Sequence, residues 1–178
     1  MVISQPRMMR PTDEQLWCWV AEVSDPEIPV LSITDLGIVR DIAWQDGACE
    51  VSITPTYAGC PAMQVIEDNI KAVLQQHGVD AAVRTVLSPA WTTDWITDSG
   101  RSKLQAYGIA PPAGTAVTDQ LTQAVNISAL LSRRDEPVAC PQCGSSHTRL
   151  ISQFGSTACK ALYRCADCLE PFDYFKPH

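Results

Sequence analysis

Histidine is scarce in this chain of 178 residues, which holds only His77, His147 and His178. No Glu-x-x-His pair is present, so the chain cannot by itself build the di-iron carboxylate site of a helical bundle. Neighbouring residues suggest neither a Ser-His-Asp nor a Cys-His combination. The chain also lacks a glycine-rich phosphate loop and a dinucleotide-binding fingerprint. These absences argue against catalysis by the chain alone, and we expect no catalytic residue.

Long apolar runs are also missing. The sequence contains no stretch of ~18 apolar residues of the kind that crosses a membrane. Its first ten residues lack the apolar core of a signal peptide. A content of 46% hydrophobic and 19% charged residues is typical of soluble globular proteins. We therefore expect a cytoplasmic protein without a membrane partner, long enough for one ordinary domain and one small domain.

The net charge of −7 is confined to the first part of the chain. Residues 1–110 hold 14 Asp and Glu against 7 Lys and Arg, whereas residues 111–178 hold 6 of each. An acidic domain is repelled by phosphate backbones, so we expect no nucleic-acid partner. A basic protein surface would be attracted, although a solvated acidic face explains the same pattern.

Hydrophobic periodicity and turn signals predict an α+β fold, with a small mixed sheet packed by helices. Asp46-Gly47 is a strong hairpin signal between two strand-like runs, and a later strand would join this hairpin after a helical crossover. Capping residues and glycines bound the helices. The expected elements are a helix capped by Thr12 and running to about Val23, strands Ile38–Trp44 and Ala48–Ile53, a helix Ala62–His77, a strand Ala82–Leu87, and a helix capped by Asp98 and running to about Tyr107.

Cys60 stands where the second strand passes into the long helix. Pro61 suits the first position of a helix, so Cys60 is expected to be its N-cap. A thiol in that place feels the positive end of the helix dipole, which favours the thiolate that attacks electrophiles and binds metals. A half-buried, unreactive cysteine that caps a turn is the other interpretation.

Residues 110–138 differ in character from both flanks, with Pro-Pro-Ala-Gly near their start and Arg-Arg-Asp-Glu-Pro near their end. We interpret them as a linker that contains one short amphipathic piece, Gln120 to Leu131. The predicted domains are therefore residues 1–109 and residues 139–178.

The last forty residues contain two C-x-x-C pairs separated by 21 residues, Cys140/Cys143 and Cys165/Cys168. This spacing is one residue beyond the usual window of a four-cysteine zinc ribbon. Each pair presents two sulfurs from one tight turn, and four sulfurs complete a tetrahedron. Such a small piece needs the metal in order to fold. Structural zinc is the expected ion, although iron or an iron–sulfur cluster uses the same ligands.

Cys159 lies between the two pairs, near the turn that joins the strands of the ribbon. We expect a free thiol on a loop, exposed beside Lys160, that is able to bind or relay a metal. A packed small hydrophobic residue is the other interpretation.

Several motifs together resemble the small domain of iron–sulfur assembly and targeting factors: Asp25-Pro-Glu-Ile-Pro, Asp35-Leu-Gly-Ile-Val, and Thr54-x5-Cys60-Pro followed by a helix. Within this group the chain resembles the accessory D components of bacterial phenylacetyl-CoA epoxidase systems. Three longer stretches carry the narrower match, namely residues 89–96, 108–114 and 154–165, together with the tail at residues 170–175. The resemblance covers nearly the whole chain except the N-terminal lead and residues 115–137.

The resemblance implies an accessory role in aerobic phenylacetate catabolism, without chemistry of its own. Its partners would be the di-iron oxygenase or the flavin and iron–sulfur reductase of that system, whose metal centres it would help to assemble. Cys60 maps onto the reactive cysteine of the family and would hold iron or a cluster transiently. Asp25, Glu27 and Thr54 belong to the supporting motifs. Two copies that pair their Cys60 thiolates are one way to complete such a site.

Two other functions remain open. The chain could be a structural docking component of the oxygenase complex, with zinc needed only for folding. It could also be a thiol enzyme that acts on a CoA thioester through Cys60, but no base partner for the thiol is visible.

Overall fold

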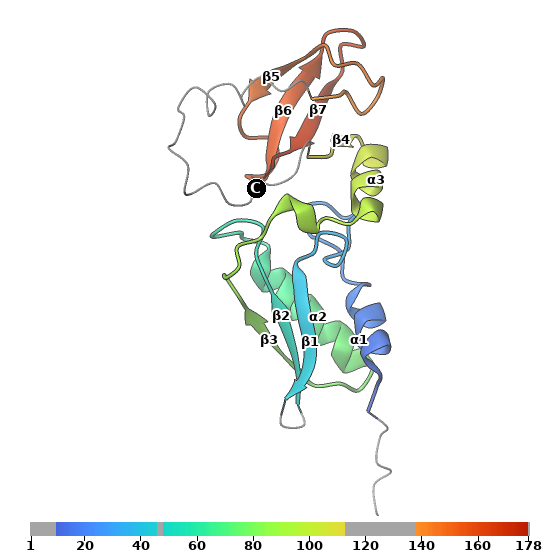
Figure 1. Cartoon of the computed structure of the whole chain (residues 1–178), viewed down its shortest axis with the longest axis vertical. Coiled ribbons are helices and arrows are strands. Elements are labelled where there is room, and N and C mark those ends of the chain that lie inside the picture. Colours follow the sequence, from blue (N-terminus) through green and yellow to red (C-terminus); the bar gives the residue numbers. More distant parts are fainter. Residues whose placement is uncertain (1–9, 46–47, 113–137, 178) are drawn as a thin grey trace, which may run out of the picture.

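The computed structural model describes residues 10–45, 48–112 and 138–177. Within these ranges the chain forms two sheets, one in the lower part and one in the upper part of Figure 1. The elements in chain order are α1 (Asp13–Val20), β1 (Val39–Gln45), β2 (Ala48–Ile53), α2 (Met63–Gln76), β3 (Ala81–Thr85), η1 (Thr93–Trp95), α3 (Asp98–Tyr107), β4 (Ile109–Ala110), β5 (Thr148–Ser152), β6 (Lys160–Cys165) and β7 (Pro171–Phe175). The predicted α+β class is confirmed.

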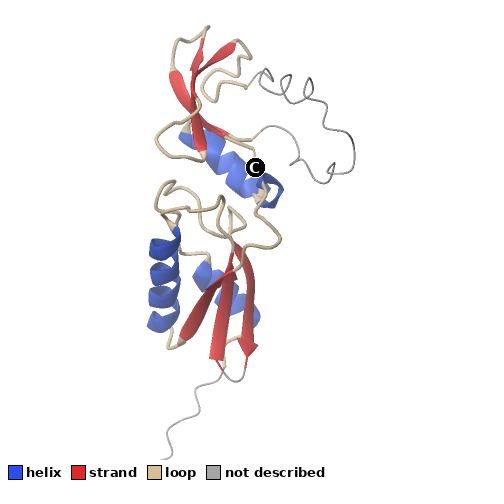
Figure 2. Cartoon of the chain, turned by 90° about the vertical axis from the view of Figure 1, so that its left-hand side faces the viewer, coloured by secondary structure: helices blue, strands red, loops and turns tan. Residues whose placement is uncertain are grey.

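The first sheet has the order β1-β2-β3 and carries helices against it (Figure 2). β1 and β2 form the predicted antiparallel hairpin, and β3 runs parallel to β2 after the crossover through α2. Helix α2 buries Ile66, Ile70 and Leu74. Val65, on the same helix, is 47% exposed.

Helix α1 begins with a reciprocal capping box, in which the Thr12 side chain accepts from the Gln15 N–H and the Gln15 side chain accepts from the Thr12 N–H. It buries Leu16 and Val20. The prediction that it reaches Val23 is wrong, because the helix ends at Val20 and the Glu22 and Val23 N–H groups bond to carbonyls three residues back, in a turn.

Helix α3 is capped one residue earlier than predicted. Thr97, not Asp98, is the N-cap, and its hydroxyl oxygen accepts from the Gly100 N–H. Asp98 occupies the first turn, where its charge complements the helix dipole. Gly108 ends the helix in the left-handed conformation, at φ 89°.

The loop between α1 and β1 is fixed by buried polar contacts. Asp35 accepts from the Ser32 N–H at 3.0 Å and from the Lys103 ammonium at 2.6 Å, which joins the loop to α3. The Trp91 indole N–H donates to the Leu36 carbonyl at 2.9 Å. These contacts attach the proline-containing loop to α3 and to Trp91.

The second sheet has the order β4-β7-β6-β5 and forms the C-terminal ribbon. Its edge strand β4 comes directly after α3 and pairs in parallel with β7. Phe175, at the end of β7, is 1% exposed and belongs to the hydrophobic core of the first domain. Its ring lies 6.1 Å from that of Trp91. The two parts therefore share a strand and a core at the place where a linker is predicted to begin.

Two predicted features lie outside the described residues: the Asp46-Gly47 turn and the amphipathic piece from Gln120 to Leu131. Among the described residues, no helix is long and apolar enough to cross a membrane.

Candidate functional site

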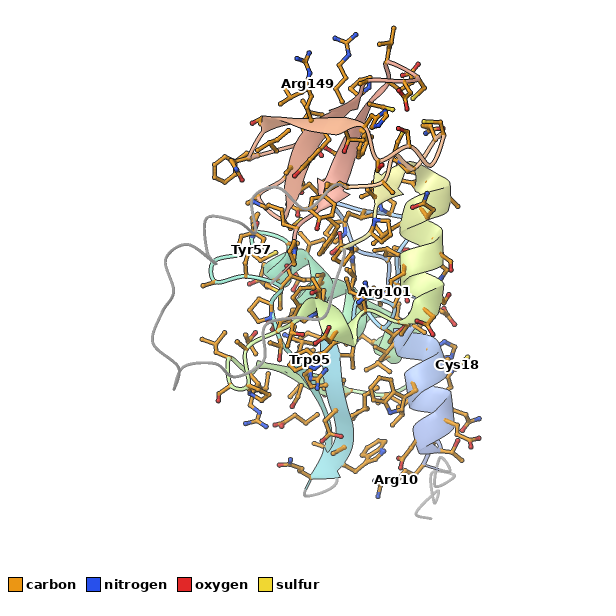
Figure 3. All side chains as sticks on the ribbon, turned by 45° about the horizontal axis from the view of Figure 1, so that its top comes forward. Arg10, Cys18, Tyr57, Trp95, Arg101 and Arg149 are labelled. Carbon is orange, nitrogen blue, oxygen red and sulfur yellow. The ribbon has the colours of Figure 1, made fainter. Side chains whose placement is uncertain are left out.

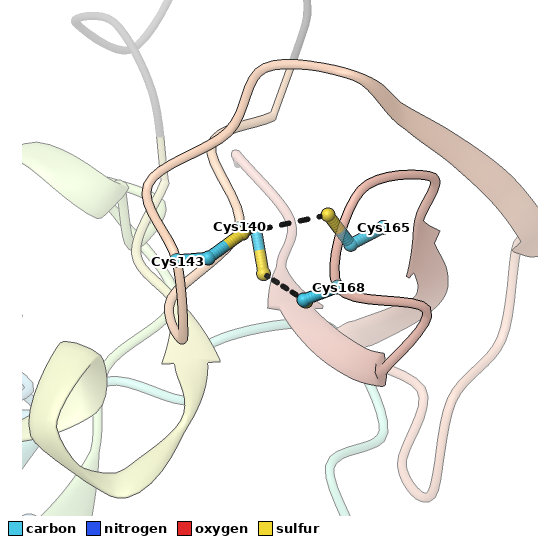
Figure 4. A group of neighbouring side chains, drawn as sticks. All are labelled: Cys140, Cys143, Cys165 and Cys168. Atoms are coloured by element: carbon cyan, nitrogen blue, oxygen red, sulfur yellow. Dashed lines mark hydrogen bonds between the residues drawn. The ribbon is translucent and has the colours of Figure 1, made fainter.

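The four ribbon cysteines point toward one another from two turns (Figure 4). The Sγ atoms of Cys140 and Cys168 are 3.7 Å apart, and those of Cys143 and Cys165 are 3.6 Å apart. All four sulfurs lie within 4.8 Å of one another. This arrangement confirms that the two C-x-x-C pairs meet.

These separations fit a zinc ion. Tetrahedral Zn–S bonds of about 2.3 Å place the sulfurs about 3.8 Å apart, whereas a disulfide would need about 2.0 Å. Backbone N–H groups of Cys168 and Asp167 lower the pKa of the Cys165 thiol to about 6, whereas the pKa values of Cys143 and Cys168 are raised, that of Cys168 to about 12. A bound cation would therefore be needed to hold all four thiolates. Four protein ligands leave no open position, so a metal bound there would be structural.

Backbone hydrogen bonds shape the first of the two turns. The Cys140 N–H donates to the Ser145 carbonyl at 2.8 Å, and the Gly144 N–H donates back to the Cys140 carbonyl at 2.9 Å. Gly144 adopts φ 74°, a conformation that glycine takes without strain. Cys140 and Cys165 are fully buried, so the metal would be shielded from solvent on one side.

Cys60 lies in a different environment, at the end of the first sheet that faces the ribbon. The prediction that it is the N-cap of the long helix is wrong, because α2 begins at Met63 and its N-cap is Ala62. Cys60 instead closes the preceding turn, where its N–H donates to the Tyr57 carbonyl at 3.2 Å. The side chain is half-buried.

The predicted shift of the Cys60 thiol toward thiolate is also wrong. Burial raises the pKa of this thiol, and the Glu27 and Asp25 carboxylates raise it further. The Ala62 N–H and the Tyr57 hydroxyl lower the pKa, but they do not outweigh burial. The free thiol is therefore protonated at neutral pH, and a bound cation would be needed to hold the thiolate.

The Asp25-Pro-Glu loop stands close enough to Cys60 for its two carboxylates to raise the pKa of the thiol, after burial. Asp25 is buried and accepts from the Glu27 N–H at 2.9 Å and from the Ile28 N–H at 2.7 Å. It therefore holds the loop that presents Glu27. Burial raises the pKa of the Glu27 carboxyl, and the neighbouring Asp25 carboxylate raises it further.

Cys159 is buried, at 4% exposure, and belongs to the hydrophobic core, so the packed residue is the correct interpretation and the exposed thiol is wrong. Its sulfur lies 3.9 Å from Glu27 Oε2 and 3.0 Å from the Thr157 hydroxyl. Lys160 is also buried, and its ammonium pairs with Asp173 at 3.2 Å. The ribbon thus delivers a second thiol to the acidic loop of the first domain.

Tyr57 is the residue that sequence reasoning missed (Figure 3). Its pKa is raised to about 12, mainly by burial and then by Cys60 and Glu27. It stands three residues before Cys60, within the Thr54-x5-Cys60-Pro motif. A turn at this point of the sequence would have indicated that the Tyr57 side chain lies close to the cysteine. Thr54 is buried directly after β2, and its N–H donates to the Ile38 carbonyl at 2.9 Å, so it positions the start of this turn.

Two family matches divide the chain as the two sheets do. Residues 14–88 match the family described as iron-sulfur cluster assembly protein, and residues 125–176 match the PaaD zinc beta ribbon domain.

One curated relative matches part of the chain, and another matches nearly all of it. The Fe-S protein maturation auxiliary factor YitW of Bacillus subtilis (strain 168) is 37% identical over 76 residues, which are 41% of this chain and 74% of that protein. A solved structure of the domain of unknown function DUF59 from Bacillus anthracis is 26% identical, with a TM-score of 0.48, over 51% of this chain and 89% of that chain. A protein of Escherichia coli (strain K12), named as the D component of 1,2-phenylacetyl-CoA epoxidase, is 46% identical over 167 residues and 93% of each chain. The chain therefore belongs to the family of phenylacetyl-CoA epoxidase D components.

Proposed function

We propose that this protein is an accessory maturation factor of a multicomponent phenylacetyl-CoA epoxidase. In this role Cys60 is a transient ligand for iron or an iron–sulfur cluster on its way to the reductase or oxygenase subunits. The observation that carries the proposal is the half-buried Cys60 thiol beside the Glu27 carboxylate, in a domain that matches iron-sulfur cluster assembly proteins.

The chemistry of this site suits transfer better than storage. A thiolate and a carboxylate are too few ligands to close the coordination shell of iron, so exchangeable positions remain for the ligands of a client. The raised pKa of Cys60 works in the same direction. Once the metal leaves, the thiol recovers its proton and does not compete for the metal again.

The test is epoxidase activity in cells or extracts that contain the other subunits and either the intact protein or Cys60→Ser. Cys18→Ser is the matched control, because Cys18 is an exposed thiol on α1, a helix that packs on the first sheet. We expect Cys60→Ser to lower the activity and the iron content of the client subunits, with Cys18→Ser unchanged. Full activity of Cys60→Ser would remove this role.

A structural docking component is the second candidate, and the outer strand of the ribbon favours it. β5 is an edge strand, and Leu150 and Ile151 on it are 39% and 50% exposed. Phe154, in the following turn, is 67% exposed. This function predicts stoichiometric co-purification with the oxygenase and indifference to Cys60→Ser, so the same variant separates the two candidates.

A further inference from the structure

Potential metal ligands from both domains meet at the junction of the two sheets. Glu27 comes from the loop after α1, Cys60 from the turn before α2, and Cys159 from the turn before β6. Cys159 Sγ lies 3.9 Å from Glu27 Oε2, and Cys60 packs against the hydrophobic core that contains Cys159. After burial, Cys60, Glu27 and Cys159 each raise the pKa of the Tyr57 hydroxyl, so the three side chains lie near the same residue.

We propose that Cys159 is a second thiolate ligand of the transfer site, so that Cys60, Glu27 and Cys159 together bind the metal. This inference rests on the proposed function and extends it, because it makes the ribbon part of the site. Two sulfurs and one oxygen suit borderline divalent ions such as Fe²⁺. Three protein ligands leave one position of a tetrahedral ion open, as transfer requires.

The position of Cys159 is fixed by the fold of the ribbon. Its carbonyl accepts from the Lys176 N–H at 3.0 Å, directly after Phe175 enters the core of the first domain. The Lys160 N–H donates to the Thr157 carbonyl at 3.2 Å and closes the turn that carries the thiol. Cys159 is therefore held against Glu27 and is not a loose loop residue.

The electrostatics of the locus favour a cation. Two carboxylates, Asp25 and Glu27, face the two thiols, and the nearby Lys160 ammonium is already paired with Asp173. Binding of a hydrated divalent ion releases the two thiol protons and the displaced water ligands to solvent, forms two metal–sulfur bonds and one metal–oxygen bond, and moves no electrons. The two positive charges of the ion then offset the two thiolates, and the Glu27 carboxylate leaves one net negative charge.

The ligand atoms of the locus are less closely gathered than those of the ribbon site. Among the residues that the structure describes, only the four ribbon cysteines form a group of three or more ligands that could hold an ion as they stand. The side chains of Cys60 and Glu27 must therefore turn toward Cys159 to surround a single ion. Because the second thiolate comes from the same chain, pairing of two Cys60 residues in a dimer is not needed.

The experiment is an anaerobic titration of the full chain with Co²⁺, after the ribbon has been loaded with zinc. Thiolate-to-cobalt absorption reports the sulfur ligands, and zinc content is measured before and after the titration. We expect one additional Co²⁺ per chain in the intact protein and in Cys18→Ser. Cys60→Ser and Cys159→Ser should each lose about half of the absorption. Their affinity for Co²⁺ should fall at least about tenfold, because even the loss of a side chain that only orients a metal ligand weakens metal binding by about 10- to 100-fold.

Binding by Cys159→Ser equal to that of the intact protein would overturn the inference. If Cys159→Ser does not fold, Glu27→Gln provides the second test, because it keeps the shape of the side chain and removes its charge. Glu27→Gln should weaken Co²⁺ binding while the absorption from both thiolates is kept. Unchanged affinity for Co²⁺ would overturn the inference as well.

The same variants in the epoxidase assay separate this inference from the proposed function. Loss of activity in Cys60→Ser, with Cys159→Ser normal in activity and in Co²⁺ binding, would leave the proposed function standing and remove the second ligand. Full activity in Cys60→Ser would remove the proposed function, whatever Co²⁺ binding shows.

Discussion

The molecule contains two groups of cysteines that differ in geometry. The ribbon group has four sulfurs within 4.8 Å of one another, and the pKa values of its thiols move in both directions, to about 6 for Cys165 and to about 12 for Cys168. The junction group has two thiols, one from each domain, whose pKa values are raised first by burial and also by adjacent carboxylates. Four converging sulfurs would hold a metal in place, whereas two thiols and a carboxylate would leave a position open for exchange.

The two groups are not independent, because the ribbon builds part of the junction. β4 extends directly from α3 into the ribbon sheet, and Phe175 returns from that sheet into the core of the first domain. A metal that folds the ribbon therefore also places Cys159 beside Glu27. Four substitutions, taken in order of decreasing expected effect, test the contributions of these regions.

The largest effect is expected from removal of a ribbon ligand. Cys140→Ser should lose the zinc and the folded ribbon, because structural zinc supplies roughly 10–16 kcal/mol of apparent binding energy in small zinc domains. Zinc per chain and amide hydrogen exchange in β5, β6 and β7 measure this. Cys18→Ser is the control, and a Cys140→Ser protein with full zinc and protected strands would contradict the structural role.

The next effect concerns the contact between ribbon and first domain. Phe175→Ala should lower the free energy of unfolding by about 3–5 kcal/mol, the usual cost of truncating a buried phenylalanine. Phe154→Ala is matched in chemistry but removes a ring that is 67% exposed, so it should change stability little. Urea unfolding of the two variants checks this, and equal stability would mean that Phe175 does not join the two domains.

A smaller effect is expected at Asp35, which links the loop before β1 to α3. Burial raises the pKa of this carboxyl, but hydrogen bonds from Lys103 and Ser32 outweigh it and leave the pKa below its ordinary value of 3.8. The carboxylate therefore contributes stability that is present above about pH 4 and is lost as the pH falls through the folded-state pKa.

Asp35→Asn should accordingly lower the free energy of unfolding by about 1–3 kcal/mol near neutral pH and by less in acid. The exposed Asp41→Asn on β1 is the control. Urea unfolding near pH 7 and near pH 3 measures both, and a loss for Asp35→Asn that is equal at the two pH values would contradict the role of its charge.

The smallest effect on stability is expected at Cys60 itself. Its thiol is half-buried and closes no structural site, so Cys60→Ser should change the free energy of unfolding by less than about 1 kcal/mol. Cys49→Ser, at a fully buried position of β2, should cost more, about 1–3 kcal/mol, because it buries a hydroxyl. A Cys60→Ser protein less stable than Cys49→Ser would mean that Cys60 is part of the core.

Local rules were sufficient for most elements and for the ribbon ligands. Helix α2 and strands β1, β2 and β3 follow from periodicity and turn residues, and the C-x-x-C spacing alone identified Cys140, Cys143, Cys165 and Cys168. These features depend on residues that are close in sequence or on a repeated motif.

The junction could not be predicted in the same way. The contact between Glu27 and Cys159 joins residues 132 positions apart and depends on how the ribbon packs. β4 has only two residues and exists because β7 lies beside it. The pKa of Cys60 was misjudged because the helix begins at Met63, and because burial and two carboxylates outweigh the backbone N–H of Ala62. Tertiary packing, not local pattern, decides each of these.

We infer that one chain holds a structural metal site and a separate transfer site. Zinc and iron per chain, measured in the intact protein, Cys60→Ser and Cys140→Ser after purification without oxygen, distinguish the two sites. We expect one zinc that is lost only in Cys140→Ser, together with substoichiometric iron that is lost in Cys60→Ser. Zinc alone in the intact protein, unchanged in Cys60→Ser and with no iron in any form, would contradict it.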